Sequence, residues 1–199
     1  MLFFSTLLRL RRRSMIIFHD LDVLVMVNKI TNGEETVLPY VVRRANEKSV
    51  RQISAEIRSA QSRRMVGGDM ALGEDPWFAG IYSRLPEFMR HAFGRMLMNN
   101  PFSVKRNSGT VGISAVGMVA KFSGWVFPVS PQPLMFALGG ITQKPGVIGD
   151  RISVREYLSA CFLFDHDVVD GAPVARFASR LAELAERAFG LCQPEQPDQ

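Results

Sequence analysis

Apolar residues run in short β-type stretches through the first quarter of the chain. Residues 15–27 are rich in Ile and Val, with Asp20 and Asp22 placed two apart, as on one face of a strand. Residues 37–42 form a second such run, and an Asn-Gly pair, which tolerates positive φ, separates the two. The pattern predicts a β-hairpin whose second strand lies at a sheet edge or is short, because it contains Pro39.

The period of the apolar residues then changes from that of a strand to that of a helix. Residues 49–64 place apolar side chains three or four apart with charged residues between them, which predicts an amphipathic helix capped by Asn46 or Ser49. Residues 67–76 are rich in Gly and Asp and predict a mobile loop. A second helix is expected to begin near Pro86, because proline suits a first helical turn.

The second half of the chain returns to β-type patterns and ends in a helix. Strands are predicted at residues 110–117, 134–142 and 152–164, the second of them ending at a Gly-Gly pair. Residues 172–190 show the clearest helical periodicity in the chain, with a glycine as the natural stop. The chain is therefore expected to combine a sheet with several helices.

The composition is that of one globular domain. The 199 residues are 47% hydrophobic and 22% charged, which excludes global disorder and suffices for a core without disulfides or metal. We expect a basic, disordered start at residues 1–14, a domain at 15–190 and a disordered tail at 191–199. Either Met1 or Met15 is the true first residue on this interpretation.

The net charge of +5 is concentrated at one end of the chain. Arg9–Arg13 supply most of the excess, so no specific nucleic acid is expected as a partner of the domain. No apolar run reaches the ~18 residues of a membrane span. The charge follows the first apolar run, unlike in a secretory signal, although the start is compatible with a transit peptide or a membrane-surface helix.

Cysteine usage indicates a reducing compartment. Cys161 and Cys192 are too few for a disulfide framework and too far apart for a CxxC site. We therefore expect a cytoplasmic protein.

Titratable residues gather at positions 164–171, Phe-Asp-His-Asp-Val-Val-Asp-Gly, between the last predicted strand and helix. His166 lies between two carboxylates at the end of an apolar strand, where a backbone or carboxylate partner could fix its tautomer and let it act as a general base. Asp170 lies near the start of the helix, where a carboxylate can cap free N–H groups, and Gly171 permits a sharp turn.

Three other interpretations of this region stay open. The histidine could be a hydrogen-bonded structural residue at a strand end. It could also bind a metal together with Asp165, Asp167 or Asp170, although no second histidine lies nearby. Cys161 is a third candidate, as a nucleophile, but its place inside a strand does not suit attack on a substrate.

The His-x-x-x-Asp-Gly pattern at residues 166–171 resembles the catalytic signature of the dihydrolipoamide acyltransferases, the core components of 2-oxoacid dehydrogenase complexes, and of the related chloramphenicol acetyltransferases. Residues 108–117, SGTVGISAVG, are similar to that family's Gly-Thr-x-x-Ile-Ser-x-x-Gly strand. Residues 37–57 and 128–147 are similar to further segments of the family in order and spacing. The resemblance covers about residues 15–190. It implies an α/β (α+β) fold of the chloramphenicol acetyltransferase type, a mixed sheet flanked by helices in a two-layer sandwich.

The resemblance also implies an activity and roles for residues. Coenzyme A would exchange an acyl group with a thiol, such as a dihydrolipoyl arm, or with a hydroxyl acceptor, and no metal is implied. His166 would be the general base, and Ser114 would donate to the tetrahedral oxyanion, a contribution of about 3 kcal/mol. Thr110 is the weaker alternative donor. Asp170 and Gly171 would shape the histidine loop.

The family's quaternary structure carries a further implication. Its members form homotrimers with the active site between subunits, so His166 of one chain is expected to meet Ser114 of the next. A monomer would then be inactive.

The chain also departs from the family pattern. Asp167 stands where these enzymes usually have Arg, and Ala115 stands where Asn is usual. The match starts after the family's first helix and strand, and no lipoyl attachment site or subunit-binding domain is recognised, so a lipoyl group would come from a partner protein. The alternative function is a catalytically inactive trimeric scaffold or regulatory paralogue. A third is a membrane or nucleic-acid binder that uses Arg9–Arg13 and the helix at 85–98.

Overall fold

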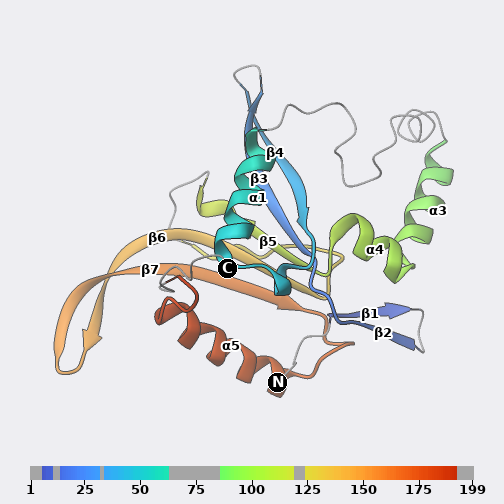
Figure 1. Cartoon of the computed structure of the whole chain (residues 1–199). Coiled ribbons are helices and arrows are strands. Elements are labelled where there is room, and N and C mark those ends of the chain that lie inside the picture. The colour runs from blue at the N-terminus through green and yellow to red at the C-terminus, as the bar shows by residue number, and fades with distance from the viewer. Residues whose placement is uncertain (1–5, 11–13, 32–33, 63–85, 119–123, 192–199) are drawn as a thin grey trace, which may run out of the picture.

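A mixed sheet forms the centre of the computed structural model, which describes residues 6–10, 14–31, 34–62, 86–118 and 124–191 (Figure 1). Its strands are β3 (Val23–Thr31), β4 (Glu34–Val42), β5 (Val111–Ala115), β6 (Leu134–Ile148) and β7 (Arg151–Phe164). The order is β4-β3-β5-β6-β7, with β5 parallel to both of its neighbours and antiparallel pairs at the two edges. The mixed sheet expected from the resemblance is confirmed.

The predicted hairpin is confirmed as β3 and β4. Val23 pairs with Val42 and Thr31 with Glu34, so β4, which contains Pro39, lies at the edge of the sheet as expected. Asn32 and Gly33 of the predicted turn lie outside the described residues.

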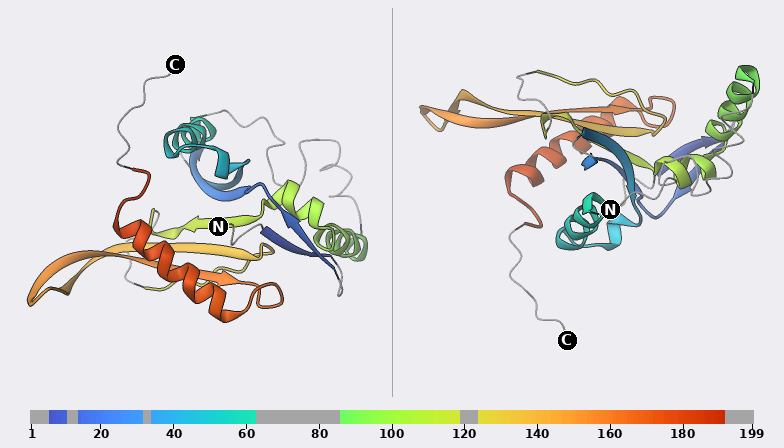
Figure 2. Two further views of the ribbon diagram at one scale, coloured as in Figure 1. Left: turned by 60° about the horizontal axis from the view of Figure 1, so that its bottom comes forward. Right: turned by 90° about the horizontal axis from the view of Figure 1, so that it is seen from above.

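Two amphipathic helices, α1 (Val50–Ser62) and α5 (Gly171–Glu186), lie on the same side of the sheet (Figure 2). Helix α1 packs on β3 and β4, and Phe177 of α5 packs on Phe136 of β6 with 6.3 Å between the ring centroids. The turn after α5 brings Gly190 beside α1, since a Cβ added at Gly190 would lie 3.6 Å from a methyl group of Val50. The arrangement is the two-layer sandwich expected from the sequence.

The capping residue of α1 is Ser49 rather than Asn46. The Ser49 hydroxyl accepts a hydrogen bond from the Gln52 amide at 3.3 Å, and the Gln52 side chain accepts one from the Ser49 amide at 2.8 Å. This reciprocal capping box satisfies two free donors of the first turn. Asn46 lies within the short helix η2 (Ala45–Glu47), and its side chain accepts from the Leu21 amide at 2.8 Å instead.

The single strand predicted at residues 15–27 is wrong. The chain forms β2 (Ser14–Phe18) and then β3, with a break between them that contains Asp20 and Asp22. The physical reason is that both carboxylates pair with cations from other elements, which holds this piece of backbone out of the sheet.

Strand β2 pairs with an additional strand, β1 (Thr6–Leu10), in an antiparallel ladder from Thr6↔Phe18 to Leu10↔Ser14. Strand β1 lies within the segment 1–14, for which the sequence analysis expected disorder.

Two helices project away from the sheet beside this hairpin (Figure 1). Helix α3 (Glu87–Met98) begins directly after Pro86, as predicted, whereas α4 (Pro101–Ser108) was not predicted. Asn100 caps α4 by accepting from the Phe102 amide at 3.0 Å, and Pro101 occupies its first turn. The loop predicted at 67–76 lies outside the described residues.

Strands β6 and β7 continue beyond α5 as a long two-stranded ribbon (Figures 1 and 2). The predicted end of β6 at Gly139-Gly140 is wrong, because the pairing only shifts register between Leu138 and Ile141 and then continues to Ile148↔Arg151. The glycines thus form a bulge within the strand rather than its end. Helix α5, by contrast, ends at Glu186, earlier than the predicted residue 190.

Among the described residues, no helix has both the length and the apolar character needed to cross a membrane.

Candidate functional site

His166 lies on the exposed loop that joins β7 to α5. Asp165 organises this loop. Its carboxylate accepts from the Asp167 amide at 3.0 Å, and its carbonyl accepts from the amides of Val168 and Val169 at 3.0 and 3.1 Å. The Asp165 amide donates to the carbonyl of Pro133 at 2.9 Å, which ties the loop to the residue before β6. The histidine is therefore presented to solvent on a hydrogen-bonded turn.

Within one chain, neither a backbone group nor a carboxylate of the described residues binds the imidazole of His166 to fix its tautomer. Among the described residues the imidazole makes no hydrogen bond, and its contact is with the ring of Phe164, at 6.0 Å between centroids and 35° between planes. The Asp165 carboxylate is engaged by the loop backbone instead. The base candidate is thus accessible, with its two ring nitrogens available to a substrate or to another subunit.

Asp170 and Gly171, which the resemblance places in the histidine loop, lie at the start of α5. Asp170 is the N-cap residue of α5, but its side chain makes no capping hydrogen bond, and only its carbonyl accepts from the Val174 amide at 3.4 Å. A Cβ added at Gly171 would meet open space, so no close approach of atoms requires a glycine there. Within a single chain, the Asp170 carboxylate therefore does not cap α5, and Gly171 is not required by close packing.

Ser114 lies in the middle of the sheet, on β5, where it is half-buried and pairs with Ala137 of β6. Close backbone approaches fix both ends of this strand. Gly109 has φ +69°, and a Cβ there would lie 2.7 Å from the carbonyl oxygen of Asp22. Gly117, in the short helix η3 (Val116–Met118) after the strand, would clash with the carbonyl of Gly139. Two glycines of the sequence motif are therefore needed to hold the serine strand against its neighbours.

Thr110, the alternative oxyanion donor, is excluded by its surroundings. Its side chain is completely buried, and its hydroxyl accepts from the Asp22 amide and donates to the Asp22 carbonyl, both at 3.0 Å. The hydroxyl therefore joins the start of β5 to the residue that precedes β3. Of the two candidate donors, Ser114 alone has a side chain without a hydrogen-bond partner among the described residues.

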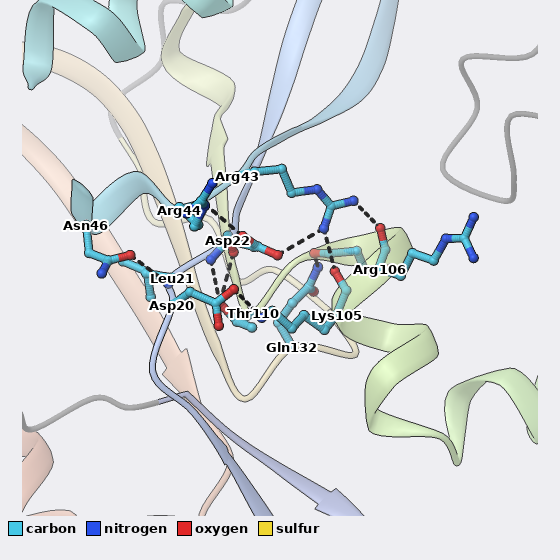
Figure 3. Close-up of polar contacts among 11 residues, drawn as sticks. Asp20, Leu21, Asp22, Arg43, Arg44, Asn46, Lys105, Arg106, Thr110 and Gln132 are labelled. Carbon is cyan, nitrogen blue, oxygen red and sulfur yellow. Dashed lines mark hydrogen bonds and ion pairs between the residues drawn. The ribbon is translucent and has the colours of Figure 1, made fainter. Parts of the chain in front are cut away.

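Asp22 is the centre of a polar network that the sequence analysis missed (Figure 3). Its carboxylate is buried, accepts from the Arg43 guanidinium at 3.0 Å and accepts from the Arg44 amide at 2.9 Å. Arg43 also donates to the carbonyls of Lys105 and Arg106 at the end of α4. The network thus joins the ends of β4 and α4 to the start of β5. The signal in the sequence that could have revealed this network is the carboxylate of Asp22 inside an apolar run.

Asp20 forms a second ion pair in the same region, with Lys105 of α4 (Figure 3). The hydrogen bond from Lys105 lowers the pKa of the Asp20 carboxyl below its ordinary value of 3.8, while partial burial acts in the opposite direction. The Lys105 ammonium also lies 4.6 Å from the centre of the Phe18 ring, and Phe18 in turn packs edge-on against Phe102. These contacts hold α4 against β2.

Other candidate chemistry finds no support in the geometry. Among the described residues, no three His, Cys, Asp or Glu side chains come together in a way that could hold a metal ion. Cys161 is half-buried inside β7, opposite Ala137. An open hollow between α3 and α4 is lined by residues such as His91 and Arg95, and neither His166 nor Ser114 contributes to it.

Comparison with known proteins identifies the class to which this arrangement corresponds. Residues 104–192 match the model of the 2-oxoacid dehydrogenases acyltransferase (catalytic domain) family. A curated relative, the dihydrolipoyllysine-residue acetyltransferase component of the pyruvate dehydrogenase complex of Zymomonas mobilis, is 35% identical over 85 residues, which are 42% of this chain and 19% of the relative. The chain therefore spans about a fifth of the length of that relative.

Solved structures extend the likeness of the fold over nearly the whole chain. The dihydrolipoamide acetyltransferase of Azotobacter vinelandii has a TM-score of 0.60 at 18% identity, covering 96% of this chain and 64% of that one. The cubic core of a pyruvate dehydrogenase multienzyme complex also has a TM-score of 0.60, at 19% identity and with the same coverage. The fold is that of an acyltransferase catalytic core. The family resemblance inferred from the sequence is confirmed, and residues 104–192, with Ser114 and His166, are the segment that carries it.

Proposed function

We propose that this chain is an acyltransferase that moves an acyl group between coenzyme A and a thiol, such as a dihydrolipoyl group on a partner protein, or a hydroxyl acceptor. The observation that carries the proposal is the exposed imidazole of His166, on a loop inside the segment that matches the catalytic-domain model. Its two ring nitrogens are not engaged by other described residues. An accessible base at this position is what proton abstraction from a thiol requires.

The proposed reaction uses two side chains of this chain. His166 takes the proton of the acceptor thiol, and the thiolate attacks the thioester carbonyl carbon of the acyl donor. Ser114 donates its hydroxyl to the oxyanion of the tetrahedral intermediate. The intermediate then collapses, the carbon–sulfur bond to the donor breaks, and His166 returns the proton to the departing thiolate.

The spacing of these residues supports their roles. In the Azotobacter vinelandii enzyme a serine, a histidine and an asparagine have been investigated for their role in the catalytic mechanism. The same number of residues separates its serine from its histidine as separates Ser114 from His166, and its asparagine follows the histidine at the spacing of Asp170. On this agreement in spacing, we assign His166 as the general base and Ser114 as the oxyanion donor. We place Asp170 as a residue that supports the loop.

We propose further that the site is completed between subunits of a homotrimer. No hydrogen bond joins His166 to Ser114 among the described residues, and each side chain lacks a partner of its own. A relative of this fold is the subunit of a cubic core. Both observations fit a site in which the base of one subunit faces the serine of the next.

A direct assay tests the activity. Purified protein is mixed with acetyl-CoA and dihydrolipoamide, or with a panel of hydroxyl acceptors, and release of the coenzyme A thiol is followed. His166→Ala should lower kcat by about 10²–10⁴-fold, the usual contribution of a general base. Ser114→Ala should lower it by about 10²–10³-fold, the usual cost of one oxyanion donor. Unchanged turnover in His166→Ala would remove the assignment of the base.

The inactive trimeric scaffold is the second candidate, because Asp170 makes no side-chain cap and Asp167 replaces the usual arginine. A titration with coenzyme A separates the two functions. The acyltransferase binds coenzyme A in a saturable isotherm, whereas the scaffold assembles without measurable binding.

A further inference from the structure

Helices α3 and α4 share an exposed face that no other described element covers. Phe88, Ala92, Arg95 and Met96 are spaced three or four positions apart in α3 and therefore lie on one side of this helix. Together with Phe102 of α4 they line the open hollow between the two helices. Helix α4 is the described element on which α3 mainly packs, and α4 itself packs on β1. The two helices thus form an arm that stands beside the sheet (Figures 1 and 2).

Large apolar side chains dominate the exposed part of this face. The exposed fractions are 72% for Phe88, 71% for Met96 and 61% for Phe102. Single apolar residues are common on protein surfaces, whereas several that share one hollow indicate a surface that meets a partner. Phe102 also packs edge-on against Phe18, so one edge of its ring fixes α4 to β2 while the rest stays exposed.

The same face carries positive charge. Arg95 lies within it on α3, and Arg106 lies one turn after Phe102 on α4. Both arginines are exposed, and neither forms an ion pair among the described residues. Figure 3 shows the Arg106 side chain pointing away from the polar network, although its carbonyl accepts from Arg43. The arm face, as we call this surface, consists of Phe88, Arg95, Met96, Phe102 and Arg106.

The charge of the whole arm has the same sign. Glu87 is the only acidic residue in the sequence between positions 86 and 108, and its carboxylate lies 3.5 Å from the imidazole of His91. The neighbouring hairpin adds to the positive charge, because residues 1–18 contain no acidic residue and Arg9 lies on β1. A partner of the arm face should therefore combine negative charge with an apolar layer.

An anionic lipid surface has this combination. The acyl chains of a bilayer take up phenylalanine and methionine side chains, while arginines beside them reach the phosphates of the headgroups. A second copy of the chain matches less well, because it would bring Arg95 and Arg106 of both copies together. A nucleic acid would match the arginines and the rings, but stacking on bases makes no use of the exposed methionine.

We infer that the arm face binds the surface of a membrane that contains anionic phospholipids. The inference goes beyond the proposed acyl transfer and does not depend on it. Arg43 donates to two carbonyls at the end of α4, and Lys105 of α4 pairs with Asp20. These contacts fix α4 to the sheet, so the arm face and the domain bind as one body. The chain would then act as a peripheral membrane protein.

Vesicle binding of the full chain tests the inference. The protein is titrated with vesicles of phosphatidylcholine alone and with vesicles of equal parts phosphatidylcholine and phosphatidylglycerol, and the bound fraction is measured by flotation. Wild type should bind the anionic vesicles and stay free of the neutral ones. The affinity should fall when salt is raised from about 0.1 M to about 1 M, because the Debye length shortens from ~10 Å to ~3 Å.

Substitutions with matched controls assign the binding to the arm face. Phe88→Ser should weaken binding by about 10-fold or more, since the ring no longer enters the apolar layer. Arg95→Gln should weaken it by about 5-fold, the usual contribution of one cation near an anionic surface. Phe189→Ser is the apolar control, because Phe189 is also 72% exposed but lies after α5. Arg176→Gln, exposed on α5, is the charge control. Both controls should bind as wild type does, and thermal melts should show that all four variants are folded.

Three results would overturn the inference. The first is a wild type that ignores anionic vesicles or binds neutral ones equally well. The second is a folded Phe88→Ser variant with wild-type affinity for the anionic vesicles. The third is a different partner for the same residues. A single-stranded oligonucleotide that binds through Phe88 and Arg95 in place of vesicles would show that the partner is a nucleic acid. A smaller oligomer mass in Phe88→Ser, measured by light scattering, would show that the arm face joins copies of the chain.

Discussion

Asp165, which stands next to the proposed base, carries most of the geometry of the histidine loop. Its carboxylate accepts from the Asp167 amide, and its own amide is tied to Pro133. His166 makes none of these hydrogen bonds, so its position follows from those of its neighbour. The Asp-His-Asp sequence could have predicted this turn, since aspartate side chains often accept from the amide two residues on.

Removing the Asp165 carboxylate should therefore lower turnover without touching the reacting atoms. Asp165→Ala is expected to reduce kcat by roughly 10–100-fold with a smaller change in KM, because a misplacement of about 1 Å can cost 10²-fold. Asp165→Asn keeps an acceptor oxygen and should retain near wild-type turnover. Steady-state kinetics of the two variants check this. Equal losses of kcat in both variants would show that turnover depends on the charge of Asp165 rather than on the turn that its side chain stabilises.

Asp20 gives the fold a dependence on pH with a definite sign. Its pKa in the folded chain is lowered below 3.8, chiefly by the hydrogen bond from Lys105. The unfolded chain then takes up this proton at a higher pH than the folded chain. The ion pair therefore contributes its full stabilisation above the ordinary pKa of the carboxyl group. This contribution is lost as the pH falls through the lower pKa that Asp20 has in the folded chain.

The thermal unfolding midpoint should consequently fall less steeply with acid in Asp20→Asn than in wild type, in the window below about pH 5. Lys105→Met removes the same ion pair and should flatten the profile similarly. Asp150→Asn, at the exposed turn of the ribbon, is the control. A wild-type slope retained in Asp20→Asn would contradict this role of the ion pair.

Among the elements, β5 is the one that the rest of the domain fixes most closely. Thr110 and Gly109 hold its start against Asp22, and Gly117 lets its end pass close over Gly139. Gln132, before β6, donates to the Ser108 carbonyl at 2.6 Å just before the strand begins. The serine proposed for the oxyanion site thus lies on an element that is positioned by both of its ends.

Thr110→Val should destabilise the domain by about 1–3 kcal/mol, because the shape is kept while the buried Asp22 amide loses its acceptor. Thr110→Ser keeps the hydroxyl and should lose less. Urea unfolding of both variants measures the difference. If the Thr110→Val variant proves as stable as Thr110→Ser, the hydroxyl does not fix the junction of β3 and β5.

The same elements show what the sequence could predict and what it could not. Periodicity located the β3–β4 hairpin, α1 and α5, because each has a continuous apolar pattern. It failed between β2 and β3, where Asp20 and Asp22 pair with cations far along the chain. It also missed α4, whose eight residues are too few for a periodic signal.

On the scale of the whole molecule, the sequence anticipated the class of fold and placed His166 between the last strand and the last helix. It could not show whether that loop meets Ser114, because one chain leaves both side chains without hydrogen-bond partners among the described residues. The proposed site depends on contacts that no single copy contains.

Complementation between two inactive variants tests this account most directly. His166→Ala and Ser114→Ala are each assembled alone and then co-assembled in equal amounts, and acyl transfer from acetyl-CoA is measured. If the base and the serine of one site come from different subunits, the randomly co-assembled population should recover about one quarter of wild-type turnover, because each mixed trimer has one interface of three that unites an intact His166 with an intact Ser114. Mixed trimers of confirmed composition that stay as inactive as either variant would contradict a site shared between subunits.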